Sequence, residues 1–175
     1  MSHIALGAPL WPPPQFLALI RAKPIYDPRQ ASPARIVTGP ELDQLLPRVF
    51  DEGKRAIRFD PDDPGADTWG APARVWHPGL LSPGRWIKTG DCDEYVFEWA
   101  SRLLDEGIDP GAIRYVMCRT EELQAHLVLT VDTEERTLVF CNRQQGIWTF
   151  GEGPMARYLW LKASEPGQFF WRAVE

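Results

Sequence analysis

The sequence predicts an α+β domain, because two amphipathic helical patterns are followed by a series of β-strand patterns. The stronger helix begins after Asp91 and ends at Gly107. Its apolar face, repeated at helical spacing, consists of Cys92, Tyr95, Val96, Trp99, Ala100, Leu103 and Leu104. Strands are expected near residues 112–118, 124–131, 136–142, 146–150, 156–162 and 168–174.

The N-terminal part differs from the rest. Residues 1–39 are rich in proline, so we expect an extended or irregular arm that wraps the core through Trp11, Phe16, Leu17 and Ile20. The domain itself is expected over residues 40–175. Thr38, Pro40 and Glu41 favour a helix start, and the apolar face of that helix consists of Leu42, Leu45, Leu46, Val49 and Phe50. A short strand at 55–59 and a long loop over 60–89 are expected to follow.

Composition is that of one compact globular domain. The chain has 175 residues, of which 44% are hydrophobic and 25% charged. It carries 24 acidic and 19 basic residues with no basic run, so nucleic acid is not an expected partner. No apolar stretch approaches the length of a membrane span, and the N-terminus lacks the pattern of a secretory signal, which favours a cytoplasmic protein. The three cysteines, at 92, 118 and 141, have no metal-binding spacing and are expected to be reduced.

Cys92 is the candidate nucleophile. Asp91 is the expected N-cap and Glu94 completes a capping box, which makes Cys92 the first helical residue. Free N–H groups and the dipole at a helix N-terminus stabilise a thiolate. A catalytic thiol also needs a base. Of the three histidines, His3 lies in the arm and His77 in a Pro/Gly loop segment, whereas His126 lies in an apolar strand pattern and is the preferred base.

Three blocks of this sequence resemble the bacterial transglutaminase-like cysteine proteinases. They are residues 90–95 at the helix start, 124–129 on a strand and 138–142 on the next strand. Weaker similarity lies in 67–72, 158–161 and 170–171, so the resemblance covers about residues 40–175. It implies a papain-like or transglutaminase-like core in which the cysteine helix packs on an antiparallel sheet. It further implies cleavage of peptide bonds in a protein or peptide substrate by Cys92 and His126.

The third catalytic position departs from the family pattern. Relatives typically read Leu-Asp-Asn where this chain has Phe140, Cys141 and Asn142, so Cys141 replaces the usual acid. The loop around residues 132–135 decides the pairing: we expect a four-residue loop to place Cys141 opposite His126, and a three-residue loop to place Asn142 there. An asparagine can orient a histidine, whereas a thiol lacks the charge of a carboxylate. Both residues therefore stay candidates.

Two further features concern ligands. Asp91, Asp93 and Glu94 match positions that, in the adhesin-processing members of the family, belong to a calcium site; the alternative is that these acids only cap the helix. Trp69, which lies upstream of Cys92 in a family-like segment, is expected to line the substrate groove or to pack a loop onto the core.

Two functions remain open on this basis. The first is a cysteine peptidase, whose thioester chemistry could also serve deamidation or amide transfer, with no required cofactor other than a possible calcium ion. The second is a catalytically weakened structural or host-interaction module, such as a virion protein, because relatives without a signal peptide are often encoded by bacteriophages. The sequence predicts no oligomeric state.

Overall fold

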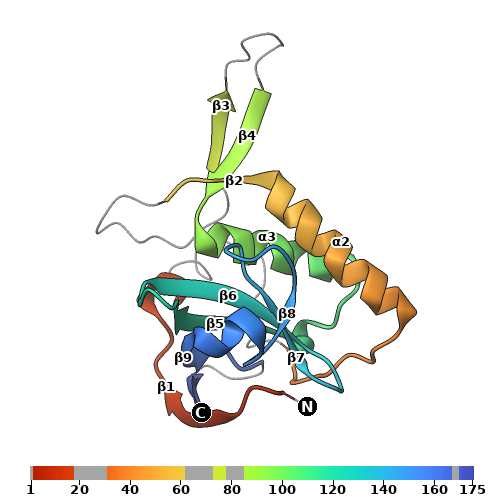
Figure 1. Cartoon of the computed structure of the whole chain (residues 1–175), viewed down its shortest axis with the longest axis vertical. Helices are drawn as coiled ribbons and strands as arrows, with labels where there is room; N and C mark the ends of the chain where they lie inside the picture. The colour runs from red at the N-terminus through yellow and green to blue at the C-terminus, as the bar shows by residue number, and fades with distance from the viewer. Residues whose placement is uncertain (1, 18–30, 62–72, 78–84, 167–169) are drawn as a thin grey trace.

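The structure is a computed structural model that describes residues 2–17, 31–61, 73–77, 85–166 and 170–175 (Figure 1). Its long helices are α2 (Pro40–Ala56) and α3 (Cys92–Asp105); residues 14–17 are also helical, and η2 (Pro110–Ala112) and η3 (Gly153–Arg157) are short 3-10 helices. The large sheet has the order β1-β10-β9-β5-β6-β7-β8. Its strands are β1 (Leu6–Leu10), β5 (Ile113–Arg119), β6 (Ala125–Asp132), β7 (Thr137–Phe140), β8 (Trp148–Thr149), β9 (Leu159–Ala163) and β10 (Trp171–Val174).

Every pairing in this large sheet is antiparallel, which confirms the predicted α+β architecture. The six predicted C-terminal strands all form, although β8 is reduced to two residues. The N-terminal arm contributes β1, which pairs with β10 at the sheet edge. Among the described residues, no helix is long and apolar enough to cross a membrane.

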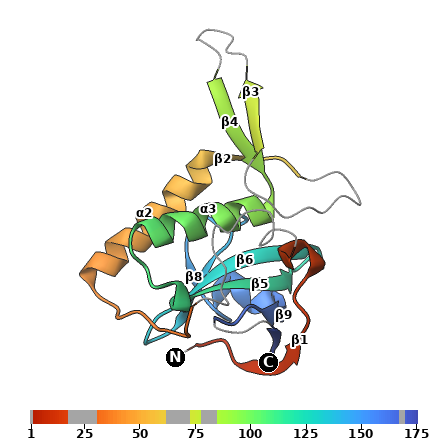
Figure 2. The same ribbon diagram turned by 180° about the vertical axis from the view of Figure 1, so that it is seen from behind.

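A second sheet changes the picture expected for residues 60–89. Its order is β2-β4-β3, with β2 at Ile57–Phe59, β3 at Ala73–His77 and β4 at Arg85–Gly90. β2 confirms the short strand expected at 55–59, whereas the prediction of a loop was wrong for β3 and β4, and the backbone of His77 belongs to β3. β3 and β4 extend away from the large sheet (Figures 1 and 2). The pairing of β4 with both neighbours fixes the chain directly before α3.

The start of α2 also differs from expectation. Gly39 is its N-cap and no side chain caps it. The Thr38 hydroxyl instead donates to Glu135 Oε1 at 2.9 Å, so the predicted capping role of Thr38 was wrong. Pro40 at the first helical position needs no capping acceptor, because proline has no backbone N–H.

The core consists of two apolar clusters on the two faces of the large sheet. Side chains alternate along a strand, so Leu127, Leu129 and Val131 of β6 join the cluster under α2 and α3. Val128 faces the other way, into a second cluster with Cys118, Cys141, Met155 and Tyr158. This two-sided burial confirms the interpretation of 124–131 as a strand covered on both faces.

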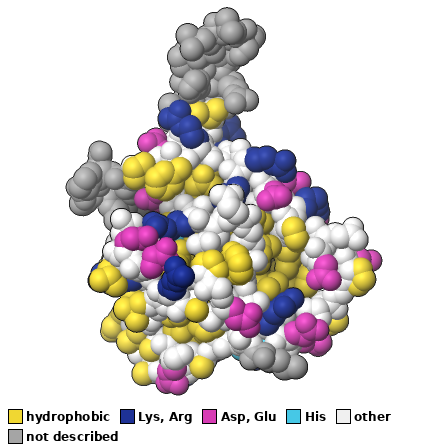
Figure 3. Space-filling view, in the orientation of Figure 1, with side chains coloured by type: hydrophobic (Ala, Val, Ile, Leu, Met, Phe, Trp, Pro, Cys, Tyr) yellow, Lys and Arg dark blue, Asp and Glu magenta, His cyan; other side chains and the backbone are white. Residues whose placement is uncertain are grey.

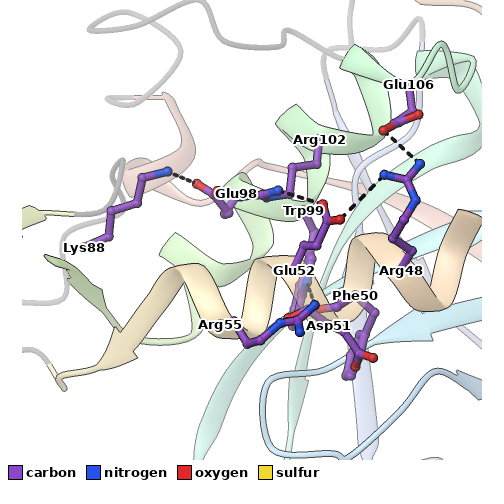
Figure 4. Close-up of polar contacts among 10 residues, drawn as sticks. All are labelled: Arg48, Phe50, Asp51, Glu52, Arg55, Lys88, Glu98, Trp99, Arg102 and Glu106. Atoms are coloured by element: carbon purple, nitrogen blue, oxygen red, sulfur yellow. Dashed lines mark hydrogen bonds and ion pairs between the residues drawn. The ribbon is translucent and has the colours of Figure 1, made fainter.

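The two long helices are held together tightly where they cross (Figure 4). Trp99 of α3 stacks on Phe50 of α2 and donates its indole N–H to the Phe50 carbonyl at 3.0 Å. Around this contact, the ion pairs include Lys88–Glu98, Arg102–Glu98, Arg102–Glu52 and Arg48–Glu106, and Glu98 is buried. Lys88 of β4 thereby ties the second sheet to α3. These contacts fix the helix that begins with Cys92.

The surface is electrically mixed. On the face shown in Figure 3, Lys and Arg side chains are interspersed with Asp and Glu, and hydrophobic side chains lie between them. This face shows no extended basic patch, which agrees with the net charge of −5.

Candidate active site

Cys92 is the first residue of α3, as predicted. The Asp91 side chain accepts the Asp93 N–H at 3.4 Å, and Glu94 Oε2 accepts the Asp91 N–H at 2.7 Å. The Asp91 side chain also accepts the Glu94 backbone N–H, and this bond together with the one from the Asp91 N–H to Glu94 confirms the capping box. Cys92 is half-buried and packs against the apolar cluster under α3. Its thiol therefore lies where the helix N-terminus favours a negative charge.

His126 is the second residue of β6 and is only 7% exposed. Its ring nitrogen Nε2 lies 3.3 Å from Cys141 Sγ. The Tyr158 ring packs edge-on against the imidazole, with 6.2 Å between the ring centres. Both neighbours belong to the second apolar cluster, so the histidine ring is anchored in the core.

One pocket of about 240 Å³ brings these distant segments together. It is lined by Phe59, Pro61, Asp91, Cys92, Gln124, Ala125, His126, Asn142 and Arg143. The end of β2, the start of α3, the start of β6 and the segment after β7 therefore meet here. The predicted nucleophile and base share this pocket although 33 intervening residues separate them in the sequence.

Burial determines the charge state of His126. It lowers the pKa of the imidazole to about 4, assisted by the positive charge of Arg143 and opposed by the negative charge of Asp91. His126 is thus neutral at pH 7. A neutral imidazole has an unprotonated ring nitrogen, which is what acceptance of a proton from a thiol requires.

The third position is occupied by Cys141. The loop of β6 and β7 has four residues between the paired Asp132 and Thr137; Leu129 pairs with Phe140, and extending this register by one residue places Cys141 across from Val128. The predicted pairing of Cys141 with His126 was therefore wrong by two residues. The contact is made diagonally, because both side chains lie on the same face of the sheet. Burial raises the pKa of Cys141, so this residue is a neutral thiol.

Asn142 takes a different place from Cys141. It lines the pocket, and its Oδ1 is buried without a hydrogen-bond partner. The contact at hydrogen-bond distance from the His126 ring is made by Cys141. The geometry thus gives Cys141 the position behind the histidine and leaves Asn142 facing the pocket.

The acids at the start of α3 form a compact group. Ligand atoms of Asp91, Cys92 and Asp93 all lie within 4.8 Å of one another, and Asp93 is buried. Glu94, the third predicted calcium ligand, uses Oε2 in the capping box. Trp69, the predicted groove residue, lies outside the described residues.

Two residues of this region were missed in the sequence. Arg143 lines the pocket and pairs with Glu122 at 2.8 Å. Tyr158 lies 32 positions after His126, in a tail segment whose family-like pattern gave no hint of a contact with the histidine. The one signal in the sequence was that this tail segment also resembles the family.

Comparisons with known proteins identify the family of this chain. The family model of the bacterial transglutaminase-like cysteine proteinases matches residues 82–175, which include Cys92, His126 and Cys141. No curated protein matches. Among solved structures, LapG of Legionella pneumophila has a TM-score of 0.57 at 16% identity, covering 78% of this chain and 71% of that chain.

Two further structures of the same Legionella pneumophila protein resemble the chain. The EGTA-treated form has a TM-score of 0.57 at 16% identity and covers 78% of this chain and 69% of that chain. The calcium-bound form has a TM-score of 0.55 at 16% identity and covers 74% and 67%. At this identity the likeness shows a shared fold. Because the family model matches more than half of its length, the chain belongs to the bacterial transglutaminase-like cysteine proteinases.

Proposed function

We propose that this proteinase cleaves peptide bonds with Cys92 as the nucleophile and His126 as the base. The observation that carries the proposal is the shared pocket. It brings together a thiol at a helix N-terminus and a neutral histidine whose Nε2 is in contact with Cys141. Nε2 of that histidine faces Cys141, which leaves Nδ1 as the nitrogen available to Cys92.

The reaction then follows acyl transfer. Cys92 Sγ attacks the carbonyl carbon of the substrate while its proton passes to His126 Nδ1. A helix N-terminus stabilises negative charge, so the backbone N–H of Cys92 is our proposed donor to the oxyanion. His126 next gives its proton to the leaving amine, which leaves a thioester. Attack of water on that thioester, with His126 again taking a proton, releases the acid and restores the thiol.

Charged residues around the pocket influence the transfer of the proton from Cys92 to His126. Protonation of His126 is opposed by burial and by Arg143 and favoured by Asp91. The imidazolium is stabilised further when the thiolate forms beside it, because opposite charges attract strongly in a partly buried site. Cys141 adds no negative charge, which makes this site weaker than one with a carboxylate. This deficit is the observation that favours the second candidate, a catalytically weakened module.

Alkylation by iodoacetamide tests the nucleophile. We expect Cys92 to react fastest in the intact protein between pH 5.5 and 8, a range around the ordinary histidine pKa of about 6.5, read by peptide mass spectrometry. Cys118 and Cys141 are each 1% exposed, and burial raises the pKa of both thiols, so they should react slowly. A His126→Gln variant should slow Cys92 near neutral pH. Dominant labelling of Cys118 would remove Cys92 from its role.

Cleavage of a generic protein separates the two candidates. Fluorescein-labelled casein should be cut by the wild-type protein and not by Cys92→Ser. The matched control is Cys118→Ser, which changes a thiol outside the pocket. Equal activity, or equal inactivity, of the wild-type and Cys92→Ser proteins would favour the weakened module.

Calcium is a further part of the proposal. The carboxylates of Asp91 and Asp93 are hard oxygen ligands that suit Ca²⁺, whereas the Cys92 sulfur does not. A structure of Legionella pneumophila LapG is described as calcium-bound, which supports a test here. When bound, the ion would add positive charge at the start of α3. Asp91 and Asp93 would hold it, and the rest of its shell would need other oxygen ligands.

Thermal unfolding tests the ion without an activity assay. We expect calcium to raise the melting temperature of the wild-type protein relative to EGTA, and Asp93→Asn to abolish that increase. Asp105→Asn, an exposed change at the other end of α3, is the control. A wild-type melting temperature unaffected by calcium would reduce these acids to helix capping.

A further inference from the structure

The sulfur of Cys141 lies among several polar groups. His126 Nε2 is 3.3 Å away and the Tyr158 hydroxyl is 3.6 Å away. The backbone N–H groups of Arg143 and Gln144 also stabilise negative charge on this sulfur. Gln144 Nε2 in turn donates to the Tyr158 oxygen at 3.4 Å. The position where the family resemblance leads us to expect an acid therefore lies within a set of hydrogen-bonding groups.

A thiol in this place differs from a carboxylate in one respect, its own hydrogen. An ionised carboxylate only accepts, so a histidine beside it must donate. A neutral thiol can instead donate its hydrogen to Nε2, which moves the histidine proton to Nδ1. In that tautomer Nδ1 cannot accept a proton from Cys92. The active tautomer carries its hydrogen on Nε2, directed at the sulfur, and requires the thiol hydrogen to point elsewhere.

Tyr158 is placed to accept that hydrogen. Among the described residues, its hydroxyl is the other side-chain group at hydrogen-bond distance from Cys141 Sγ. A phenolic oxygen can accept from both Gln144 and the thiol. The same residue packs its ring edge-on against His126. Tyr158 is 5% exposed, so water has little access to compete.

We propose that Tyr158 is a positioning residue of this proteinase. Its hydroxyl accepts the Cys141 S–H, which makes the sulfur the acceptor for His126 Nε2–H and leaves Nδ1 free for the proton of Cys92. Its ring restrains the rotation of the imidazole. The inference rests on the proposed roles of Cys92 and His126, and it adds a residue that acts only through Cys141 and His126.

Long-range ¹H–¹⁵N spectra of histidine-labelled protein read the tautomer directly, without any substrate. The chain has three histidines, and His126→Gln assigns the signal. We expect the Nε2–H tautomer in the wild-type protein at pH 7. Tyr158→Phe retains the ring and removes the acceptor, so a population with the hydrogen on Nδ1 should appear. The proposal would be overturned if the wild-type protein has its hydrogen on Nδ1. It would also be overturned if the Tyr158→Phe spectrum is identical to the wild-type spectrum.

A matched variant controls for loss of a buried hydroxyl. Tyr95 donates its hydroxyl to the Ile57 carbonyl at 2.8 Å, away from Cys141, so Tyr95→Phe should reduce stability without changing the tautomer. A tautomer change of equal size in Tyr95→Phe would show that the effect of Tyr158 is merely structural, and would contradict the proposal.

A carboxylate at position 141 provides the sharpest comparison. In a Cys141→Asp background there is no thiol hydrogen to place, so adding Tyr158→Phe should leave the tautomer unchanged. In the wild-type background Tyr158→Phe should lower the rate of Cys92 alkylation at pH 7 by roughly tenfold, since a wrong tautomer disables the base. Equal losses in both backgrounds would refute the role assigned to the thiol hydrogen.

The two proposals fail in distinguishable ways. If casein cleavage does not depend on Cys92, the proposed function is wrong. The tautomer measurement would then still describe the arrangement of His126, Cys141 and Tyr158. If cleavage depends on Cys92 but the His126 tautomer does not change in Tyr158→Phe, the proposed function holds and the role of Tyr158 is wrong.

Discussion

At the scale of single residues, the site combines a neutral histidine with a neutral thiol. Burial lowers the pKa of His126 to about 4 and raises the pKa of Cys141. An ion pair between them is therefore disfavoured in the free protein. The charges of catalysis must arise during the reaction, when Cys92 loses its proton to His126.

The burial of His126 predicts a pH dependence of stability. The unfolded chain protonates this histidine near pH 6.5, whereas the native state resists protonation down to about pH 4. Between these values the unfolded state binds more protons, so the free energy of unfolding should decrease as pH falls, by about 1.4 kcal/mol per pH unit from this group. Below about pH 4 the loss is complete.

Urea unfolding at pH 7, 5.5 and 4.5 measures this effect. The difference between the wild-type protein and His126→Gln isolates the histidine, because the carboxylates that titrate in this range are common to both. A difference that stays constant across the three pH values would contradict the assignment of a low pKa to His126.

Cys141→Asp should raise the pKa of His126, because a carboxylate next to Nε2 stabilises the imidazolium. We expect faster casein cleavage, by about tenfold or more, together with a loss of stability, since the new charge is buried. Turnover and melting temperature are the measurements.

Asn142→Ala is the comparison for that prediction. Asn142 Oδ1 has no partner in the described structure, so its removal should change the free energy of unfolding by less than about 1 kcal/mol. Turnover should change less than threefold, about 0.7 kcal/mol or less. If Asn142→Ala abolishes turnover while Cys141→Asp has no effect, the orienting role belongs to Asn142.

At the scale of helices and strands, the position of Cys92 depends on how α3 packs against α2. Gly53 of α2 faces the Trp99 indole so closely that a Cβ at this position would overlap the ring. Gly53→Ala should therefore push the helices apart and lower the free energy of unfolding by about 1–3 kcal/mol. Chemical denaturation tests this, with Gly146→Ala as control, because a Cβ at Gly146 would meet no neighbour. Equal stability of the two variants would contradict the close crossing.

Local patterns predicted these elements well and their contacts less well. The capping box at Asp91 and the two-sided burial of β6 depend on residues a few positions apart, so the sequence reveals them. β3 and β4 were missed because Pro and Gly surround them, and those residues favour loops in any local interpretation. His126 of β6 contacts Tyr158, which follows η3. These residues are far apart in the sequence, so no local pattern predicts their contact.

The register of β6 and β7 shows a similar limit. The four-residue loop is one of the two lengths considered, but the register that goes with it, extended by one residue beyond the Leu129–Phe140 pair, places Cys141 beside Val128. The contact between His126 and Cys141 is diagonal, between side chains on the same face of the sheet. A prediction that considers only directly opposite residues does not include such contacts. The sequence left Cys141 and Asn142 as alternatives, and the structure places Cys141 beside the His126 ring by a contact that neither expected pairing describes.

At the scale of the whole molecule, the N-terminal strand closes one edge of the large sheet. β1 pairs with β10, and Ile4 and Leu6 pack on the cluster that contains Cys141 and Tyr158. A variant lacking residues 1–11 should therefore be less stable, and it should shift the NMR signals of His126. Its exposed β10 edge should also promote self-association, visible as concentration-dependent elution in gel filtration. A monomeric variant of unchanged stability would show that β1 is dispensable.

The pairing of β1 with β10 also places the last residues of this sequence beside residues 5 and 6, and both ends lie on the same side of the molecule (Figure 1). Leu6 is opposite Val174, and the Glu175 N–H donates to the Ala5 carbonyl at 3.1 Å (Figure 1). A short peptide could join the ends, and new ends could then be opened in an exposed turn, giving a circular permutant that keeps all strands of the pocket. Fusion partners attached to either end would emerge on the same side of the molecule (Figure 1). Immobilisation through one end would thus leave the other close to the same support.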